Sequence, residues 1–383
     1  MRRIWLTAPI VALLLVAAGP SGAAVAASCS WRQVRTPASD NSFLYGVSAR
    51  SPSDAWAVGL TESGAQTLSL TMHWNGRSWR LVPSPNTADG AWLAGVGIAP
   101  SGEAWAAGWS TSATFSQSTL VERWDGSAWS IESTPNPGTG SNRLAAIAVV
   151  ASDDAWAVGG WGDVSARGHP LIEHWDGLTW RVVNGPNARG GSLDGIAAVT
   201  ADDVWAVGVQ DLPSGQLTVF EHWDGTRWSR VPAPAPTPRP FLFDISAAGS
   251  SDVWAVGYTY DGSRFHGVTE HWDGTSWSVV PDPALFLGHH RGGVPGNHLQ
   301  GVAALSGGDV RAVGGRTNTS GSFSNIAERW DGTAWSLMRV DQPGLGGELL
   351  DAAGVPGTTD AWAVGYNAPP PGTIARPLIE RSC

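Results

Sequence analysis

Residues 252–257 read Asp-Val-Trp-Ala-Val-Gly, and residues 270–277 read Glu-His-Trp-Asp-Gly-Thr-Ser-Trp. Variants of these two phrases alternate along the chain. The first phrase, an acid and then Trp-Ala-Val-Gly in its fullest form, occurs seven times, and the second occurs six times in whole form. A chain of 383 residues with 23 Trp, against 4 Tyr and 8 Phe, is therefore built from a repeat.

The spacing of the first phrase gives the length of the repeat. Its third position is occupied in turn by Trp56, Trp105, Trp156, Trp205, Trp254, Arg311 and Trp362. These positions are 49, 51, 49, 49, 57 and 51 residues apart, and Arg311 replaces the Trp in the sixth copy. A period of about 50 residues with this content is typical of the blades of a β-propeller.

Each repeat contains four short β-strand patterns. In the sixth repeat they are the apolar run 299–305, the first phrase at 309–314, residues 326–330 and residues 334–338. The Asp-Gly step inside the second phrase predicts a hairpin between the last two strands, because Gly adopts the positive φ that such turns need. We therefore predict an all-β, seven-bladed β-propeller of four-stranded antiparallel blades, with the small residues of each first strand nearest the axis.

The N-terminal segment resembles a targeting signal. Arg2 and Arg3 precede an apolar run, residues 4–18, and Ala24-Val25-Ala26 has the small-x-small form of a cleavage site. We expect a signal peptide at residues 1–26, a single domain at 27–383, a secreted, extracellular product and no membrane span. A twin-arginine signal and a lipidated Cys29 are the open alternatives for export.

The two chain ends complement each other. The last copy of the second phrase stops at Glu380-Arg381-Ser382-Cys383, while Cys29-Ser30-Trp31 aligns with the Thr275-Ser276-Trp277 half of a complete copy. We therefore expect the N-terminal strand to complete the last blade and close the ring. The same alignment predicts a Cys29–Cys383 disulfide, which an exporting compartment permits. Two free or lipidated cysteines are the alternative.

The order of these strands resembles the kelch-type β-propeller repeat over about residues 29–383. The resemblance lies in an apolar strand, an aromatic-x-Val-Gly strand, a variable loop, and then Trp-Asp with a Trp-initiated outer strand. The Trp-rich tandem pattern is also similar to repeats of proteins exported by actinobacteria. The resemblance implies the propeller fold, and it implies no particular activity.

The net charge of the chain argues against two classes of binding partner. The formal net charge is −10, and all 23 basic residues are Arg. Nucleic acids and anionic membrane surfaces need a basic footprint, so we expect neither as a partner. The repeated His174, His222 and His271 occur in most blades and are interpreted as structural.

Three features of the variable loop face are candidate ligand sites. The first is a set of aromatic residues that follow the Val-Gly strand end and offer flat faces for stacking on sugars, or alternatively cover the loops beneath them. Its members are Trp109, Trp161, Tyr258 and Tyr366. The second is the insertion with His289, His290 and Arg291, followed by His298, where imidazoles suit zinc or copper. A solvated loop is its alternative.

The third feature is acidic. Asp194, Asp244 and Asp351 are expected at equivalent inner-strand positions, where carboxylates lining the axis suit calcium. Separate solvation of each carboxylate is the alternative, so whether any metal binds stays open. Close approach of the three with raised pKa values would favour an enzyme.

Enzyme signatures are weak in this chain. It has no nucleophile elbow, no His-Glu-x-x-His and no phosphate loop. We assign no catalytic residue and expect no cofactor. The prediction is a secreted, monomeric binding module whose ligand, an extracellular glycan or a protein, binds the variable loop face. The alternative is an extracellular hydrolase or lyase that acts on polysaccharide at the mouth of the central channel.

Overall fold

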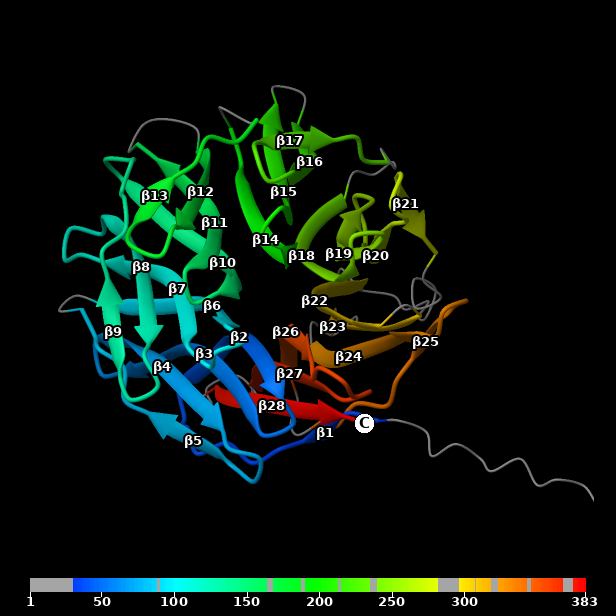
Figure 1. Cartoon of the computed structure of the whole chain (residues 1–383). Coiled ribbons are helices and arrows are strands. Elements are labelled where there is room, and N and C mark those ends of the chain that lie inside the picture. The colour runs from blue at the N-terminus through cyan, green and yellow to red at the C-terminus, as the bar shows by residue number, and fades with distance from the viewer. Residues whose placement is uncertain are drawn as a thin grey trace, which may run out of the picture.

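The protein folds into a disc of β-strands around a central axis (Figure 1). The structure, a computed structural model, describes residues 30–87, 90–163, 168–186, 190–212, 215–234, 240–281, 296–306, 308–317, 323–342, 346–367 and 375–383. All helices and strands assigned in these ranges are strands, 28 in number. Accordingly, the described residues contain no helix long and apolar enough to cross a membrane.

Successive strands pair antiparallel into blades of four, and each blade is named here by its first and last strand. The first three blades are β2 (Ser42–Ser51), β3 (Asp54–Ser63), β4 (Gln66–Trp74) and β5 (Trp79–Val82); β6 (Ala91–Ile98), β7 (Ala104–Thr111), β8 (Gln117–Trp124) and β9 (Trp129–Glu132); and β10 (Ser141–Ala151), β11 (Asp154–Gly162), β12 (His169–Trp175) and β13 (Trp180–Val182).

The next three blades follow the same order. They are β14 (Ser192–Thr200), β15 (Asp203–Leu212), β16 (Gly215–Trp223) and β17 (Trp228–Val231); β18 (Pro240–Gly249), β19 (Asp252–Tyr260), β20 (Phe265–Trp272) and β21 (Trp277–Val280); and β22 (Gly296–Ser306), β23 (Asp309–Thr317), β24 (Phe323–Trp330) and β25 (Trp335–Leu337). Single parallel pairs, Ser141 with Gln117 and Gly296 with Phe265, join neighbouring blades into two eight-stranded sheets.

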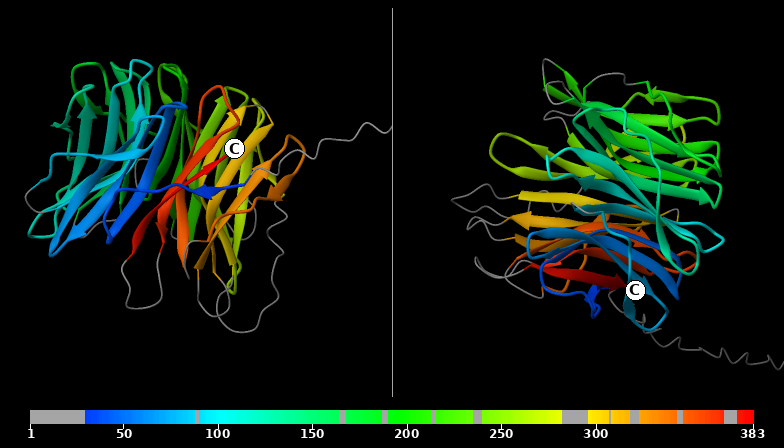
Figure 2. Two further views of the ribbon diagram at one scale, coloured as in Figure 1. Left: turned by 90° about the horizontal axis from the view of Figure 1, so that it is seen from below. Right: turned by 90° about the vertical axis from the view of Figure 1, so that its left-hand side faces the viewer.

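The remaining sheet combines the two ends of the chain. It contains β26 (Gly347–Gly354), β27 (Ala361–Asn367), β28 (Arg376–Ser382) and β1 (Arg32–Gln33), in the order β1-β28-β27-β26. Arg32 pairs with Arg381 and Gln33 pairs with Glu380. In Figure 2 the blue N-terminal strand accordingly runs beside the red C-terminal strand.

The repeated turn has the geometry that its sequence predicts. In the β18–β21 blade, Trp272 pairs with Trp277 across a loop in which Gly274 has a φ of 92°. Asp273 Oδ1 accepts hydrogen bonds from the backbone N–H groups of Thr275 and Ser276 at 2.8 and 2.9 Å. Because the carboxylate satisfies both turn amides, the Asp-Gly step closes the hairpin in each copy that carries it.

The small residues of the first strands lie where neighbouring blades come closest. The strands β2, β6, β10, β14, β18, β22 and β26 each lie against the next, and β26 lies against β2. A Cβ atom on Gly46 would lie 2.8 Å from the Cα atom of Gly95, and one on Gly301 would lie 2.6 Å from that of Asp351. The predicted position of these residues nearest the axis is therefore confirmed.

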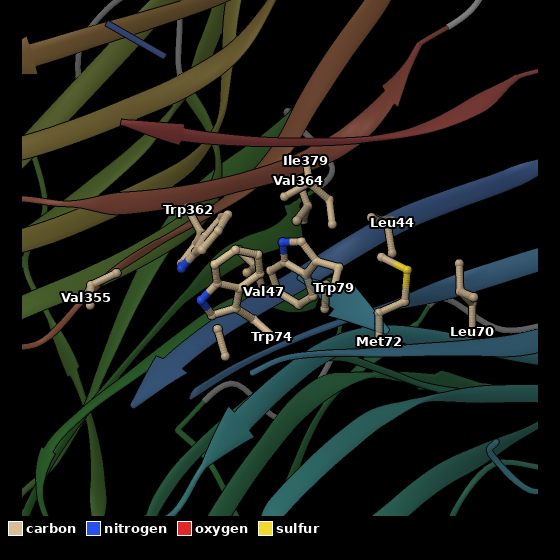
Figure 3. Close-up of a cluster of buried hydrophobic side chains, with 12 residues drawn as sticks. Leu44, Val47, Leu70, Met72, Trp74, Trp79, Val355, Trp362, Val364 and Ile379 are labelled. Carbon is tan, nitrogen blue, oxygen red and sulfur yellow. The ribbon is translucent and has the colours of Figure 1, made fainter. Parts of the chain in front are cut away.

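Clusters of three Trp side chains fill the spaces between most neighbouring blades. Trp254 of one blade packs against Trp330 and Trp335 of the next, with ring centroids 5.2 and 5.5 Å away. Figure 3 shows the same arrangement where Trp362 packs against Trp74 and Trp79. Trp254, Trp335, Trp362, Trp74 and Trp79 are buried and Trp330 is partly buried, so the rings form a large part of the core between blades.

One interface departs from this pattern. Between the β22–β25 blade and the sheet of the chain ends, Arg311 replaces the first Trp and Ser382 replaces the second, while Trp31 keeps the third place. Arg311 is fully buried and forms an ion pair with Asp309. Its guanidinium group also donates to the carbonyl oxygen of Thr359 in the next blade at 3.4 Å. Polar contacts thus replace ring packing at this interface.

Candidate functional site

A central channel of about 950 Å³ runs between the inner strands. Each inner strand contains a β-bulge at the same place, as shown by Leu44 pairing with Gly59 and Gly46 pairing with Val58, so that Tyr45 is left over. The equivalent residues of the seven inner strands, here called the bulge ring, all line the channel. They are Tyr45, Ala94, Ala145, Asp194, Phe243, Gln300 and Leu350.

The bulge explains why the first phrase ends in Gly. A Cβ atom on Gly59 would lie 1.9 Å from the carbonyl oxygen of Phe43, and the six equivalent glycines have contacts of 1.8–2.2 Å. Since the bulged backbone leaves no room for a side chain, this position is Gly in every blade. The bulge residue itself faces the channel and differs from blade to blade, which makes one mouth of the channel asymmetric.

Five aromatic side chains form a continuous series around this mouth, here called the aromatic arc. Phe43 lies 5.4 Å from Tyr366 and 6.5 Å from Tyr45, Tyr45 lies 5.2 Å from Trp92, and Trp92 stacks on Trp109 at 4.9 Å between centroids. All five side chains are half-buried. The arc spans three neighbouring blades, and burial raises the pKa of the Tyr45 hydroxyl to about 12.

A second aromatic group faces the arc from the β18–β21 blade. Tyr258 packs against Phe241, Phe243 and Phe265 with ring centroids 5.0–5.5 Å apart. It also makes an edge contact with His298 at 6.5 Å. Since Phe243 belongs to the bulge ring, this group reaches the channel as well.

The buried carboxylate of Glu348 connects the two aromatic groups. Glu348 Oε1 lies 2.6 Å from His298 Nε2 and accepts a hydrogen bond from the Gln300 amide at 3.0 Å. Its Oε2 accepts a longer bond, 3.4 Å, from the Tyr366 hydroxyl. Burial together with this negative charge raises the pKa of Tyr366 to about 12. A Tyr, a Glu and a His thus share one polar cluster at the channel mouth.

The predicted aromatic candidates therefore separate into two groups. Trp109, Tyr258 and Tyr366 follow the strand-end Gly directly. Trp109 lines the channel, Tyr258 packs against the lining residue Phe243, and Tyr366 packs against Phe43. In the β10–β13 blade Gly160 occupies the place of Trp109, so Trp161 lies one residue further along the strand, and it stacks instead on His169 at 4.1 Å. Successive strand residues face opposite sides of a sheet, so this one-residue shift accounts for the difference.

Sequence reasoning missed Phe43, Tyr45, Trp92 and Phe243. These residues lie on first strands, whose apolar character was interpreted only as core. The signal that identifies them is their position relative to the strand-end Gly of the second strand, because that Gly locates the bulge.

The acidic candidates are not all equivalent, which corrects the sequence-based alignment. Asp194 is a bulge residue, whereas Asp244 and Asp351 occupy the next position, where other blades have Gly or Ala. Asp244 accepts backbone hydrogen bonds from Ile245 and Val302, both at 2.8 Å. Asp351 accepts the corresponding bonds from Ala352 and Val47, both at 2.7 Å.

Burial raises the pKa of each of these three carboxyls. The pKa is about 6 for Asp194 and about 7 for Asp351, and that of Asp244 lies well above its usual range because the negative charge of Asp351 adds to the effect of burial. Raised pKa values are one of the two features that would favour an enzyme, the other being close approach of all three carboxyls. However, Asp244 and Asp351 use their oxygens on backbone amides of their own and the adjacent blade, which is a structural role.

Metal binding finds no support within the ranges that the structure describes. No group of three or more His, Cys, Asp or Glu side chains there is arranged to hold a metal ion. His289, His290 and Arg291 lie outside the described residues, as does Cys29, so the proposed ligands of the insertion and the disulfide with Cys383 stay predictions. His298, the remaining member of the histidine group, contacts Glu348.

The repeated histidines have the structural role expected for them. Each donates from Nε2 to the carboxylate of the first phrase in its own blade, with Nε2–Oδ1 distances of 2.8–2.9 Å, and each ring packs on the Trp of that phrase. The pairs are His174 with Asp154, His222 with Asp203 and His271 with Asp252. These contacts join the first sequence phrase of a blade to the second phrase of the same blade.

Comparison with known proteins supports the fold class alone. No family model and no curated protein matches this sequence. Among solved structures, YCF48 from Cyanidioschyzon merolae is similar with a TM-score of 0.55 and 14% identity, covering 92% of this chain and 98% of that one. The described architecture and this similarity define a β-propeller-like fold.

Two further structures share this fold at 10% identity. One is a polysaccharide lyase, a PL25 ulvan lyase bound to -[GlcA(1-4)Rha3S]-, with a TM-score of 0.56 and coverage of 91% of this chain and 95% of that one. The other is the extracellular domain of the putative one-component system BT4673 from B. thetaiotaomicron, with a TM-score of 0.51. Here the match covers 91% of this chain and 39% of the other.

Proposed function

We propose that this chain is a secreted binding module that holds a saccharide at the mouth of its central channel. The observation that carries the proposal is the aromatic arc of Phe43, Tyr45, Trp92, Trp109 and Tyr366 at one end of a 950 Å³ channel. Half-buried rings with flat apolar faces bind the apolar faces of sugars, and nearby polar groups then orient them.

The proposal includes a closed ring of seven blades. The 28 strands divide into seven groups of four, the pairing of β1 with β28 completes the last group, and the contact of β26 with β2 joins last to first. The signal sequence at 1–26, the single domain at 27–383, the kelch-type kinship and the monomeric state belong to the proposal as predictions from the sequence.

Polar groups lie beside the rings of the aromatic arc, and a saccharide site needs such groups to orient the sugar. Gln300 and Asp194 belong to the bulge ring, and Tyr45 and Tyr366 add hydroxyl groups within the arc. The lyase in the comparison is described with a bound saccharide, and the BT4673 domain is extracellular. Both facts concern those proteins, and they make a secreted saccharide binder a reasonable use of this fold.

The direct test is a glycan-array screen of residues 27–383, followed by calorimetry on the best ligand. We expect Trp109→Ala to weaken binding at least about tenfold, because a stacked ring is lost from the site. Trp161→Ala is the matched control, since Trp161 lies outside the arc and stacks on His169. Equal losses in both variants, or a folded protein that binds no glycan, would overturn the proposal and favour a protein ligand.

A lyase is the second candidate, and the Tyr366–Glu348–His298 cluster is the observation that favours it. A Tyr hydroxyl and an imidazole next to one carboxylate are groups suited to general acid–base chemistry. The test is to incubate the chain with uronate-containing polysaccharides and to follow the ultraviolet absorbance of unsaturated products. Product formation that Tyr366→Phe abolishes would establish the lyase, and its absence would leave the binding function.

A further inference from the structure

The described residues that line the channel carry acidic groups and no basic side chain. Their ionisable members other than Tyr45 are Asp194, Asp244 and Asp351. Arg143, which is not a lining residue, donates to Gln117 Oε1 at 2.5 Å and lies over the ring of Trp109. The channel is therefore an acidic cavity with an aromatic entrance.

Building on the proposed saccharide function, we propose that the channel mouth selects a sugar that carries a free, protonated amino group. Two independent features of the mouth recognise such a group. The aromatic arc attracts a cation through the negative faces of its rings, and a carboxylate of the bulge ring provides an ion-pair partner.

One ring of the aromatic arc already interacts with a cationic side chain of the protein itself. The guanidinium carbon of Arg143 lies 5.1 Å from the centroid of the Trp109 ring. Because Trp92 stacks on Trp109 and Tyr45 contacts Trp92, the same kind of ring surface continues from that point to the channel. A ligand ammonium group at the channel end of the arc would meet equivalent faces.

Among the three carboxylates, Asp194 is the one available to a ligand. Asp244 and Asp351 each accept two backbone hydrogen bonds, as described above. Asp194 Oδ1 accepts a hydrogen bond from Ser192 at 3.1 Å, and within the described residues its Oδ2 accepts none. A bulge position directs this free oxygen toward the channel, where an ammonium group supplies the missing donor.

The same charges disfavour acidic sugars. A uronate or sulfate in the channel would face the carboxylate of Asp194 and, among the described lining residues, no basic partner. Like charges at short distance in a partly desolvated site oppose binding. The inference thus names amino sugars as the ligand class within the broader saccharide proposal.

The experiment compares three oligosaccharides of equal length by calorimetry: a glucosamine oligomer with free amines, its fully N-acetylated counterpart, and a uronic acid oligomer. We expect the free amine form to bind at least about tenfold more tightly than the acetylated form, since one charge-assisted hydrogen bond is at stake. Asp194→Asn should reduce this ratio to near one. Asp153→Asn, the same change at an exposed position of the turn between β10 and β11, should leave the ratio intact.

The possible outcomes separate this inference from the proposal beneath it. Equal or tighter binding of the acetylated or acidic oligomer overturns the amino-sugar inference and leaves the saccharide site standing. A preference for the amine that survives in Asp194→Asn overturns the role of Asp194. Failure of folded protein to bind any of the three, together with an empty glycan array, overturns both.

Discussion

Asp351 Oδ2 accepts a hydrogen bond of 2.7 Å from the backbone N–H of Val47, a residue 304 positions earlier in the chain. Asp351 lies on β26 and Val47 on β2, so the bond joins the last inner strand to the first. Asp244 makes the equivalent bond to Val302 at 2.8 Å between two other blades. A carboxylate at this position therefore connects the backbones of neighbouring blades.

Replacing this carboxylate should weaken the closure of the disc. Asp351→Ala leaves the amides of Val47 and Ala352 without their acceptor, and we expect a loss of about 1–3 kcal/mol in the free energy of unfolding. Urea denaturation followed by Trp fluorescence measures it. Asp194→Ala is the matched control and should cost much less, because Asp194 accepts from a side chain at the channel surface. Equal losses would contradict the assigned role.

Buried glutamates should make the protein more stable in mild acid than in mild alkali. The Glu of the second phrase is fully buried in most blades, and burial raises the pKa of Glu173, Glu270 and Glu380 from 4.5 to about 8. Between pH 4.5 and 8 the folded chain keeps protons that the unfolded chain has lost. Stability from these groups is therefore greatest below pH 4.5 and falls as the pH rises toward 8.

The β2–β5 blade provides the substitution that tests this. It carries the buried Met72 where other blades have Glu. We expect Glu270→Met to stabilise the protein at pH 8 by on the order of 1 kcal/mol or more, with a smaller gain at pH 5. Thermal unfolding at the two pH values gives the comparison. A gain that is the same at both, or larger at pH 5, would show that Glu270 is not protonated in the folded chain.

The close approach of inner strands should make Gly301 intolerant of any side chain. A Cβ atom there would lie 2.6 Å from the Cα of Asp351, against backbone that cannot rotate away. We expect Gly301→Ala to cost about 1–3 kcal/mol or to prevent folding. Gly249→Ala, on the adjacent blade's inner strand, has open space around its Cβ and should be neutral. The expression yield and the unfolding midpoint, measured for both variants, test this difference in stability.

The predicted Cys29–Cys383 disulfide is tested by non-reducing mass spectrometry of the exported protein. Trp31 is fully buried, and β1 pairs with β28 at Arg32–Arg381, which brings the two ends of the chain together. We expect one peptide linking the two cysteines and a lower melting temperature after reduction, since a closed loop of this length restricts the unfolded chain. Two thiols that alkylate without reduction would refute the linkage.

Much of the architecture was accessible from the repeat. The alternation of the two phrases predicted all-β blades of four strands, the Asp-Gly hairpin, the small residues near the axis and the pairing of β1 with β28. Such features depend on local turn chemistry and on strand periodicity, which a sequence displays directly. The strand positions of Trp109, Tyr258 and Tyr366 could be predicted for the same reason, because each directly follows the strand-end Gly.

The candidate site was harder, because it depends on register. Gly160 takes the strand position that Trp109 has in its blade, so Trp161 lies one residue later and on the other side of its strand. Asp194 is the bulge residue of its strand, whereas Asp244 is the residue after the bulge. The contact of Trp92 with Tyr45 and that of His298 with Glu348 join different blades. No local pattern encodes these pairs, since they arise from how whole blades pack.

The linear sequence was sufficient for the repeat, its strands and its turns, because each follows from interactions between residues close together along the chain. The channel, the asymmetric bulge ring and the Glu348 cluster exist only once the blades stand side by side around the axis. Their physical origin is the bulge of each inner strand, which turns one side chain into the channel and brings the backbone so close to the second strand that only Gly fits there.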